Sequence, residues 1–171
     1  MVTKNRSKAQ KLTLSAMIIA LYVTMMYFTQ SFSFGAYQIR IATALYALSY
    51  LFPFLVLPLG LANFIANTLF GGLGLLDMVG GCLVGIVTTG LIAGIRRLNW
   101  NRCLIAVPIV LVPGLGVAAW LSYLLQLPYP ALGLSLCIGQ VIPAICGVLL
   151  VNVLDRALGG GSQKMVRRQK A

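Results

Sequence analysis

The sequence contains no histidine and only two acidic residues, Asp77 and Asp155. General acid–base and metal chemistry rely on histidines or on paired carboxylates, and two acids so far apart in the chain do not suggest such a pair. The four cysteines lie in apolar stretches without the spacing of metal ligands: Cys82, Cys103, Cys137 and Cys146. The sequence therefore predicts no enzyme, no metal site and no cofactor.

Charge of either sign is scarce, since 9% of the residues are charged, 60% are hydrophobic and the mean hydropathy is +0.95. Long apolar stretches bounded by basic clusters are typical of a polytopic helical membrane protein. Of the 13 Lys and Arg residues, all but Arg40 gather in an N-terminal tail, one short loop and the C-terminus. This pattern reflects membrane topology and argues against nucleic-acid binding. The length predicts a single membrane domain over residues 1–171.

The apolar stretches predict an all-α bundle of transmembrane helices. Four spans are clear: Leu12–Phe28, Leu75–Ile95, Leu104–Leu125 and Ala131–Leu154. The stretch Ile41–Phe70 forms either one long tilted span or two short spans, hinged at Pro53, Pro58 and Gly60. The first span follows basic residues as a signal peptide does, but its apolar run is longer and no A-x-A-like cleavage site follows. We therefore expect it to stay uncleaved.

The positive-inside rule decides how often Ile41–Phe70 crosses the membrane. If it crosses once, the basic loop (Arg96, Arg97 and Arg102) and the basic C-terminus lie outside the cell, whereas two crossings place both inside. We therefore expect six spans in the cell membrane with both termini cytoplasmic. Residues 1–11 and 157–171 are then basic cytoplasmic tails, the second of them flexible. The second and third spans are short, so local thinning or a broken helix is expected there.

In this topology the strongly polar side chains collect in the outer half of the bundle. Arg40 opens the second span and Asp77 opens the fourth. A charge costs about 2.5–3.5 kcal/mol at the centre of a membrane helix, so both are functional candidates. The other candidates in this half are Asn63 and Asn67 (on one helical face), Gln140, Trp120 and Tyr123. The mainly aliphatic inner half predicts an outward-facing cavity with a closed floor, not a continuous ion pathway.

Other roles stay open for these residues. Trp120, Tyr123 and Tyr129 also fit an interfacial aromatic belt, and the asparagines also fit hydrogen bonds between helices. Arg40 and Asp77 also fit a purely structural ion pair, because opposite charges attract strongly in a low-dielectric setting.

Two segments together resemble a known family. SFGAYQIRIATAL (Ser33–Leu45) and ANFIANTLFGGLGLLDMVGG (Ala62–Gly81) are similar to the queuosine-precursor transporter family, QueT. The resemblance covers nearly the whole chain and includes a basic start, a small-residue pair in the first span and six spans. The chain departs from the family pattern Arg-Ile-Ser-Glu-Ala-Leu, because Ala42 replaces the Ser and Thr43 replaces the Glu.

The resemblance implies the fold and function of an S component, the substrate-binding subunit of an energy-coupling factor (ECF) transporter. Such a subunit captures a 7-deazaguanine compound outside the cell and passes it to a transmembrane T component with two cytoplasmic ATPases. The resemblance places the contact with the T component at Ala16 and Ala20 and a lid at Gln30–Gln38. Thr43 in place of Glu leaves open which queuosine precursor is bound: nitrile, aminomethyl, base or nucleoside.

The candidate residues suit a purine-like ligand. A 2-amino-pyrimidinone edge presents two adjacent N–H donors, which the Asp77 carboxylate accepts as a bidentate pair. Donors for the ring carbonyl and ring nitrogens are available from four residues: Asn67, Asn63, Gln140 and Arg40. Flat stacking surfaces near the outer mouth are available from four aromatic residues: Phe34, Tyr37, Trp120 and Tyr123.

Two other classes of function stay open. One is a small helical channel or proton-coupled carrier acting alone, and the other is an assembly subunit without a ligand. The glycine-rich stretch Gly159–Lys164 is too short for an ATP-binding loop and follows a span, not a strand. ATP hydrolysis is therefore expected from the partner subunits.

Overall fold

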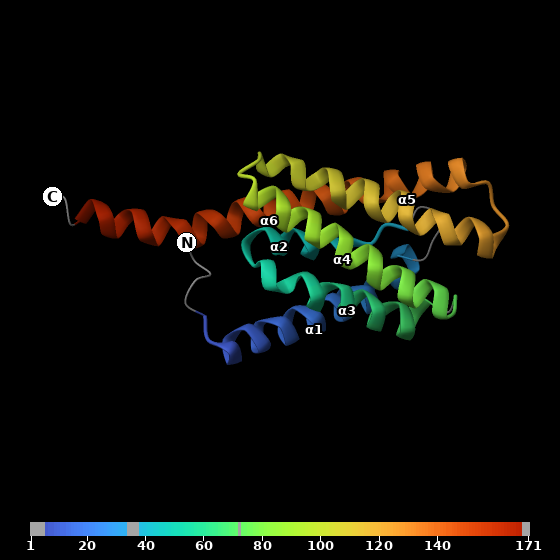
Figure 1. Ribbon diagram of the computed structural model, residues 1–171, viewed down its shortest axis with the longest axis horizontal. Coiled ribbons are helices and arrows are strands. Elements are labelled where there is room, and N and C mark those ends of the chain that lie inside the picture. The colour runs from blue at the N-terminus through green and yellow to red at the C-terminus, as the bar shows by residue number, and fades with distance from the viewer. Residues whose placement is uncertain (1–5, 34–37, 72, 169–171) are drawn as a thin grey trace.

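The computed structural model describes residues 6–33, 38–71 and 73–168, with the backbone alone for Phe32 and for residues 159–168. In these residues every regular element is helical (Figure 1). The longer α-helices are α1 (Lys8–Ser33), α3 (Val56–Ala66), α4 (Leu75–Arg97), α5 (Ala106–Leu125) and α6 (Tyr129–Arg168). Shorter segments precede or extend them: η1 (Ile41–Ala47), α2 (Leu48–Leu51), η2 (Pro53–Leu55), η3 (Asn67–Gly71) and η4 (Arg102–Ile105).

Five stretches among the described residues are long and apolar enough to cross a membrane: Lys8–Ser31, Pro53–Gly71, Leu75–Arg97, Arg102–Leu125 and Tyr129–Leu158. The segment Ile41–Leu51 is also an apolar helix but is shorter. These segments confirm the all-α membrane bundle of six helices, including the short second span. The third span is longer than expected, because η2, α3 and η3 join into one helical stretch.

The chain turns back at Phe52, between α2 and η2. A residue before proline is disfavoured in the helical region, and Phe52, which precedes Pro53, has φ −129° and ψ 81°. The other expected hinge residues, Pro58 and Gly60, lie inside α3 and do not break it. Pro58 occupies the first turn, where a missing N–H is tolerated. Gly60 packs against Ile86, which a Cβ at residue 60 would overlap.

The two arms of this turn run through the bundle in opposite directions. Before η1, Arg40 donates a hydrogen bond to Asn63 of α3. At the other end of the bundle, Arg96 donates to the carbonyls of Tyr50 and Leu51, just before the turn. The stretch Ile41–Phe70 therefore passes through the bundle twice, which is the arrangement that the charge pattern favours.

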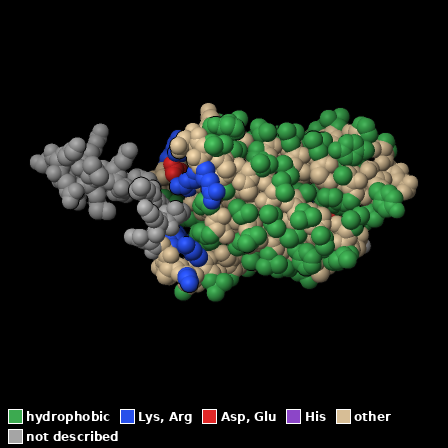
Figure 2. Space-filling model, viewed as in Figure 1, with side chains coloured by type: hydrophobic (Ala, Val, Ile, Leu, Met, Phe, Trp, Pro, Cys, Tyr) green, Lys and Arg blue, Asp and Glu red, His purple; other side chains and the backbone are tan. Residues whose placement is uncertain are grey.

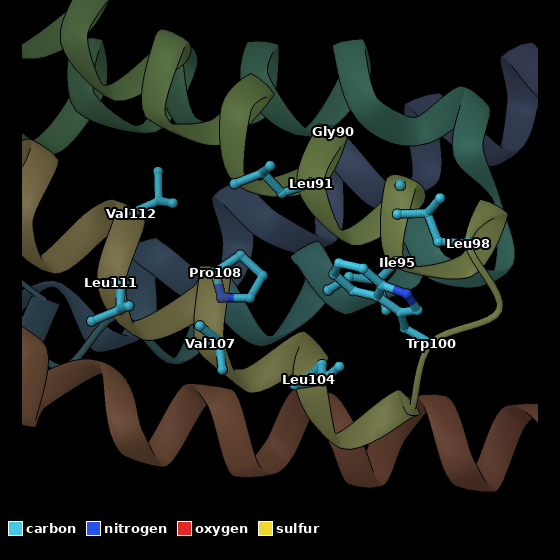
Figure 3. Close-up of a pocket in the computed structure, with 11 residues that line it drawn as sticks. Gly90, Leu91, Ile95, Leu98, Trp100, Leu104, Val107, Pro108, Leu111 and Val112 are labelled. Atoms are coloured by element: carbon cyan, nitrogen blue, oxygen red, sulfur yellow. The ribbon is translucent and has the colours of Figure 1, made fainter.

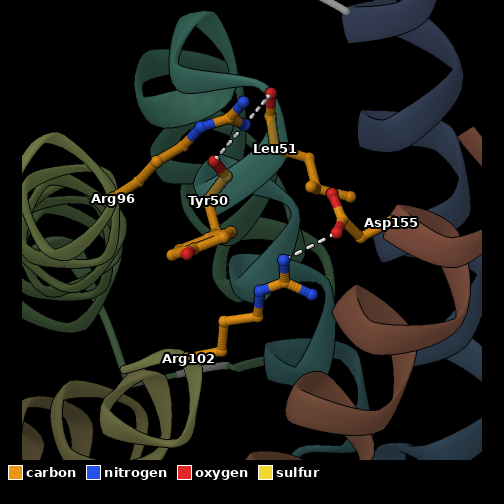
Figure 4. Close-up of polar contacts among 5 residues, drawn as sticks. All are labelled: Tyr50, Leu51, Arg96, Arg102 and Asp155. Atoms are coloured by element: carbon orange, nitrogen blue, oxygen red, sulfur yellow. Dashed lines mark hydrogen bonds and ion pairs between the residues drawn. The ribbon is translucent and has the colours of Figure 1, made fainter. Parts of the chain in front are cut away.

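One end of the bundle, here called the basic end, gathers described basic side chains from several helices (Figures 2 and 4). Arg96 lies 2.7 Å from the Tyr50 carbonyl and 2.8 Å from the Leu51 carbonyl. Arg102 forms an ion pair of 2.7 Å with Asp155. Elsewhere on the visible face hydrophobic side chains are spread over the surface and no side chain is coloured as charged. α1 begins at this end and α6 projects beyond it, so the charge pattern matches the helix arrangement (Figure 1).

The helices extend further than the sequence predicted at both ends. α1 begins at Lys8, inside the expected tail of residues 1–11. The tail from residue 157 was expected to be flexible, but α6 continues through it to Arg168. No proline follows Pro143 to stop this helix, and the three glycines from Gly159 lower its stability by about 1 kcal/mol each without blocking a hydrogen bond.

The larger hydrophobic core of the bundle is built on η1, α2 and α3, with buried side chains of α1, α4, α5 and α6 packed around them. Tyr22 of α1 and Tyr46 of η1 are fully buried, with ring centroids 5.8 Å apart and hydroxyl oxygens 3.3 Å apart. Ala16 and Ala20 lie one turn apart and are exposed on a different face of α1. The first helix therefore holds the bundle with one face and leaves its small residues at the surface.

Candidate functional site

The end of the bundle opposite the basic end contains a buried polar cluster built from four segments of the chain. Its members are at most 4% exposed: Arg40, Asn63, Asn67, Asp77 and Gln140. Arg40 precedes η1, the two asparagines lie in α3 and η3, Asp77 lies in α4 and Gln140 lies in α6. The structure thus brings together all five strongly polar residues that the sequence singled out.

Asp77 and Asn67 each have one side-chain polar atom in a hydrogen bond and one buried oxygen without a partner among the described residues. The indole N–H of Trp120 donates to Oδ1 of Asp77 across 3.1 Å. The amide of Asn67 donates to the backbone carbonyl of Asp77 across 2.9 Å. Oδ2 of Asp77 and Oδ1 of Asn67 are buried and accept no hydrogen bond from the described residues. A buried acceptor without a hydrogen bond destabilises the protein by about 1–3 kcal/mol. A ligand that donates hydrogen bonds to these two oxygens would therefore bind favourably.

Asn67 lies at the start of η3, where α3 widens into a π-helical turn (Asn67–Gly71). Such turns are rare and are frequently found at functional sites. The sequence contains no periodic signal for this turn. The spacing of Asn63 and Asn67 predicted that they share one helical face, and in the structure both amides face α4, where they bond the carbonyls of Gly81 and Asp77.

Arg40 and Asp77 do not form an ion pair with each other in the described structure. Arg40 instead donates from Nη1 to Oδ1 of Asn63 across 3.2 Å. Asn63 in turn donates to the Gly81 carbonyl across 2.7 Å. The ion pair between Arg40 and Asp77, which the sequence left open as an alternative, is therefore not formed. Instead, the neutral side-chain amide of Asn63 lies between the Arg40 guanidinium and the backbone of α4.

Two glycines of α4 make room for this arrangement. A Cβ at Gly81 would overlap the side-chain amide nitrogen of Asn67. A Cβ at Gly80 would lie 3.1 Å from the indole ring of Trp120, tighter than side-chain packing normally allows. The segment from Asp77 to Gly81 therefore supplies the carboxylate and also the space in which its neighbours pack.

Thr43, where the chain departs from the family pattern, lies within the cluster. Its hydroxyl oxygen is 2.8 Å from Oε1 of Gln140 and 2.7 Å from the carbonyl of Arg40. The side-chain amide nitrogen of Gln140 lies 3.4 Å from the carbonyl of Gln38. Sequence reasoning did not include Thr43 among the site residues. Its position three residues after Arg40, in a helical segment, is the signal that would have placed it there.

Part of the cluster lines a small cavity inside the bundle. Its volume is ≈ 10 Å³, and it is lined by Gln38, Arg40, Thr43, Tyr46, Asn63, Val84, Pro113, Val117, Leu136 and Gln140. That volume is about the room of one water molecule, whereas small-molecule sites measure about 300–1,000 Å³. The polar interior is therefore closed in this structure, with apolar side chains forming much of its wall.

A wider hollow of ≈ 550 Å³ adjoins this cavity near the α5–α6 connection. The two share Gln38 and Leu136 in their walls. Its other lining residues are Gly71, Leu73, Leu125, Leu127, Pro128, Ala131, Leu132 and Ser135. Its size falls in the range of small-molecule sites, so it is suited as an entrance to the polar cluster.

The aromatic candidates are placed differently from one another. Trp120 is half-buried and contacts the cluster through Asp77. Tyr123 is 73% exposed and is not brought to the cluster. Phe34 and Tyr37 lie outside the described residues, as does the middle of the expected lid Gln30–Gln38.

Comparison with known proteins gives one match. The family model described as QueT transporter matches residues 12–156, which covers the polar cluster and the six apolar helices except the first residues of α1 and the last residues of α6. No curated protein and no solved structure matches the chain. A match over most of the chain establishes the family, and it agrees with the helical membrane bundle. The chain therefore belongs to the QueT transporter family.

Proposed function

We propose that this multi-pass membrane transporter is the substrate-binding S component of an ECF-type importer and that it captures a queuosine precursor from outside the cell. The observation that carries the proposal is the pair of buried acceptors, Oδ2 of Asp77 and Oδ1 of Asn67, that have no donor among the described residues. These residues lie beside each other, since Asn67 also bonds the Asp77 backbone. A ligand with adjacent N–H donors would satisfy both oxygens.

A 7-deazaguanine has such an edge, with a ring N–H next to an exocyclic amine. In our proposal one donor goes to Asp77 and the other to Asn67. This differs from a bidentate contact with Asp77 alone, because Trp120 already donates to Oδ1 of Asp77. Donors for the rest of the ring come from Arg40, Asn63 and Gln140, and the Trp120 indole supplies a stacking surface.

Ligand entry requires the closed cluster to open. A cavity of ≈ 10 Å³ does not admit a bicyclic ring, whereas the adjoining hollow of ≈ 550 Å³ does. The ligand would first occupy this hollow and would then displace part of the wall. Gln38 and Leu136 line both the hollow and the cavity, so movement of these side chains would join the two.

The orientation in the membrane follows from the basic end. Positively charged loops favour the cytoplasm, so the end with Arg96 and Arg102 would face inward, with both termini cytoplasmic. The polar cluster would then face outward. A cluster of buried polar groups at this end, above the apolar core around Tyr22, suits capture of a solute from outside.

The partners in this proposal are a transmembrane T component and two cytoplasmic ATPases, which supply the energy for uptake. Ala16 and Ala20 are exposed on α1 and separated by one turn. Small residues at this spacing let another transmembrane helix approach closely. We assign the docking of the T component to this face.

Calorimetry of the purified protein without ATPases tests the proposal against four forms of the precursor: nitrile, aminomethyl, free base and nucleoside. At least one form should bind, and Asp77→Asn should weaken binding about 10- to 100-fold because it removes a charged acceptor. Asp155→Asn, which changes the other acid at the basic end, is the matched control and should bind as the wild type does. Unchanged affinity in Asp77→Asn would refute the site.

Uptake assays in proteoliposomes test whether transport requires the T component and the ATPases in addition to this protein. The protein alone should not accumulate the ligand, and coexpression with the T component and ATPases should restore uptake. Accumulation by the protein alone would favour a stand-alone carrier instead.

A further inference from the structure

A second hollow lies between α4 and α5 near the basic end, away from the polar cluster (Figure 3). Its volume is ≈ 490 Å³ and its lining is almost wholly apolar. Gly90 and Gly94 line it on α4, Val107 and Leu111 line it on α5, and Trp100 closes the end next to the connection between the two helices. We call this hollow the α4–α5 groove.

The groove is open because two glycines form part of its wall. A Cβ at Gly90 or at Gly94 would meet no atom within 4 Å. The glycines over the polar cluster differ, because Gly80 and Gly81 are in tight contact with neighbouring side chains. The open space at Gly90 and Gly94 is therefore available to a molecule outside this chain.

The last turn of α4, beside the groove, carries a basic residue on the same helical face as Gly90. Arg97 follows Gly90 by about two helical turns, so it lies on the same face of α4. Arg97 is exposed, whereas Arg96 bonds the Tyr50 and Leu51 carbonyls and Arg102 pairs with Asp155. Trp100, which is 56% exposed, is of the residue type that anchors proteins at the membrane–water interface.

We propose that the α4–α5 groove binds an anionic glycerophospholipid, with an acyl chain along Gly90 and Gly94 and the phosphate at Arg97. The apolar lining suits the hydrocarbon chain, and the exposed guanidinium complements the headgroup. A transmembrane helix of a partner would fill the apolar groove without supplying a phosphate to Arg97. The α1 face proposed for the T component is also separate, because α1 packs on α3 and η1 whereas the groove lies between α4 and α5.

Fluorescence quenching by brominated lipids tests this site in the full-length protein. The probes are phosphatidylcholine bilayers that contain either brominated phosphatidylglycerol or brominated phosphatidylcholine. Trp100 lines the groove, so bromine in the acyl chain should quench the Trp100 fluorescence. The difference in quenching between the wild type and Trp100→Phe gives the contribution of Trp100. The anionic lipid should quench Trp100 at about fivefold lower mole fraction than the zwitterionic lipid, as expected for one arginine near the surface.

Two variants separate the headgroup from the acyl chain. Arg97→Gln should abolish the preference for the anionic lipid, whereas Arg156→Gln, an exposed arginine on α6, should keep it. Gly94→Leu fills the groove and should reduce quenching by both lipids, whereas Ala119→Leu, an exposed position on α5 outside the groove, should not.

Equal quenching by the two lipids in the wild type, or a preference that survives Arg97→Gln, would overturn the proposal. So would a Gly94→Leu protein that keeps its lipid quenching but no longer assembles with its partner subunits, since the groove would then hold a helix. These results are independent of precursor binding, so they leave the proposed transport function untouched.

Discussion

Trp120 of α5 donates its indole N–H to the carboxylate of Asp77 in α4, with 3.1 Å between the nitrogen and Oδ1. The contact joins an aromatic residue and an acid that are 43 positions apart in the chain. It fixes one carboxylate oxygen and leaves the other without a described donor. The stability of the empty protein and the chemistry of its site therefore depend on the same pair.

Replacing Trp120 with Phe should destabilise the ligand-free protein by about 1–3 kcal/mol, because Oδ1 of Asp77 then loses its donor while remaining buried. The ring of Phe retains part of the packing over Gly80. Thermal unfolding in detergent measures the loss. Trp100→Phe is the matched control, since Trp100 is 56% exposed and bonds no cluster residue. Equal melting of the two variants would contradict the prediction.

Gly81→Ala should lower stability and ligand affinity together, because its Cβ overlaps the Asn67 amide and forces it from the Asp77 carbonyl. Forced repacking of this kind costs about 1–3 kcal/mol. Gly90→Ala lies on the same helix with no atom within 4 Å of the new Cβ, so it should be neutral or slightly stabilising. Calorimetry measures the ligand affinity of the two variants, and thermal unfolding measures their stability. A Gly81→Ala protein with unchanged affinity and unchanged melting temperature would contradict the packing described.

Thr43→Val should weaken ligand binding about fivefold, the effect of one hydrogen bond of about 1 kcal/mol. The substitution keeps the shape of the side chain but removes the hydroxyl that bonds Gln140, so the orientation of that amide is no longer fixed. Thr88→Val is the control, because the Thr88 hydroxyl bonds the carbonyl of Val84 within its own helix. Titration of both variants with the bound precursor checks the effect, and equal affinities would remove Thr43 from the site.

Arg96→Ala should destabilise the fold by about 1–3 kcal/mol without changing ligand affinity, because it leaves the carbonyls of Tyr50 and Leu51 without their charged donor. These carbonyls lie just before the break at Phe52, where the helix can no longer satisfy them itself. The neighbouring Arg97 is exposed, and Arg97→Ala should change stability by less than about 0.5 kcal/mol. If Arg97→Ala melted at a lower temperature than Arg96→Ala, the stabilising role assigned to Arg96 would be disproved.

Ala16→Trp and Ala20→Trp should prevent copurification with the T component while leaving precursor binding unchanged, because a large ring at the exposed face of α1 blocks close helix approach. Leu149→Trp places the same ring on the exposed side of α6 and should allow assembly. Copurification of the intact complex with either alanine variant would show that the docking face lies elsewhere.

Much of the fold followed from the sequence because a membrane imposes its own rules. Apolar runs bounded by arginines predict the helices, and the charge pattern favours two passes of Ile41–Phe70. The position of the turn was less certain. Pro53, Pro58 and Gly60 are all plausible breakers, and only the structure places Pro58 in the first turn of α3, where it does no harm.

The sequence by itself determined that the polar residues share one end of an apolar bundle, since span boundaries and helical periodicity place each residue on its own helix. Tertiary structure alone decided that Asn63 separates Arg40 from the backbone of α4, that Trp120 holds Asp77 and that Thr43 reaches Gln140. These contacts join residues far apart in sequence. They depend on how helices rotate and pack against one another, and the pattern within any one helix does not contain that information.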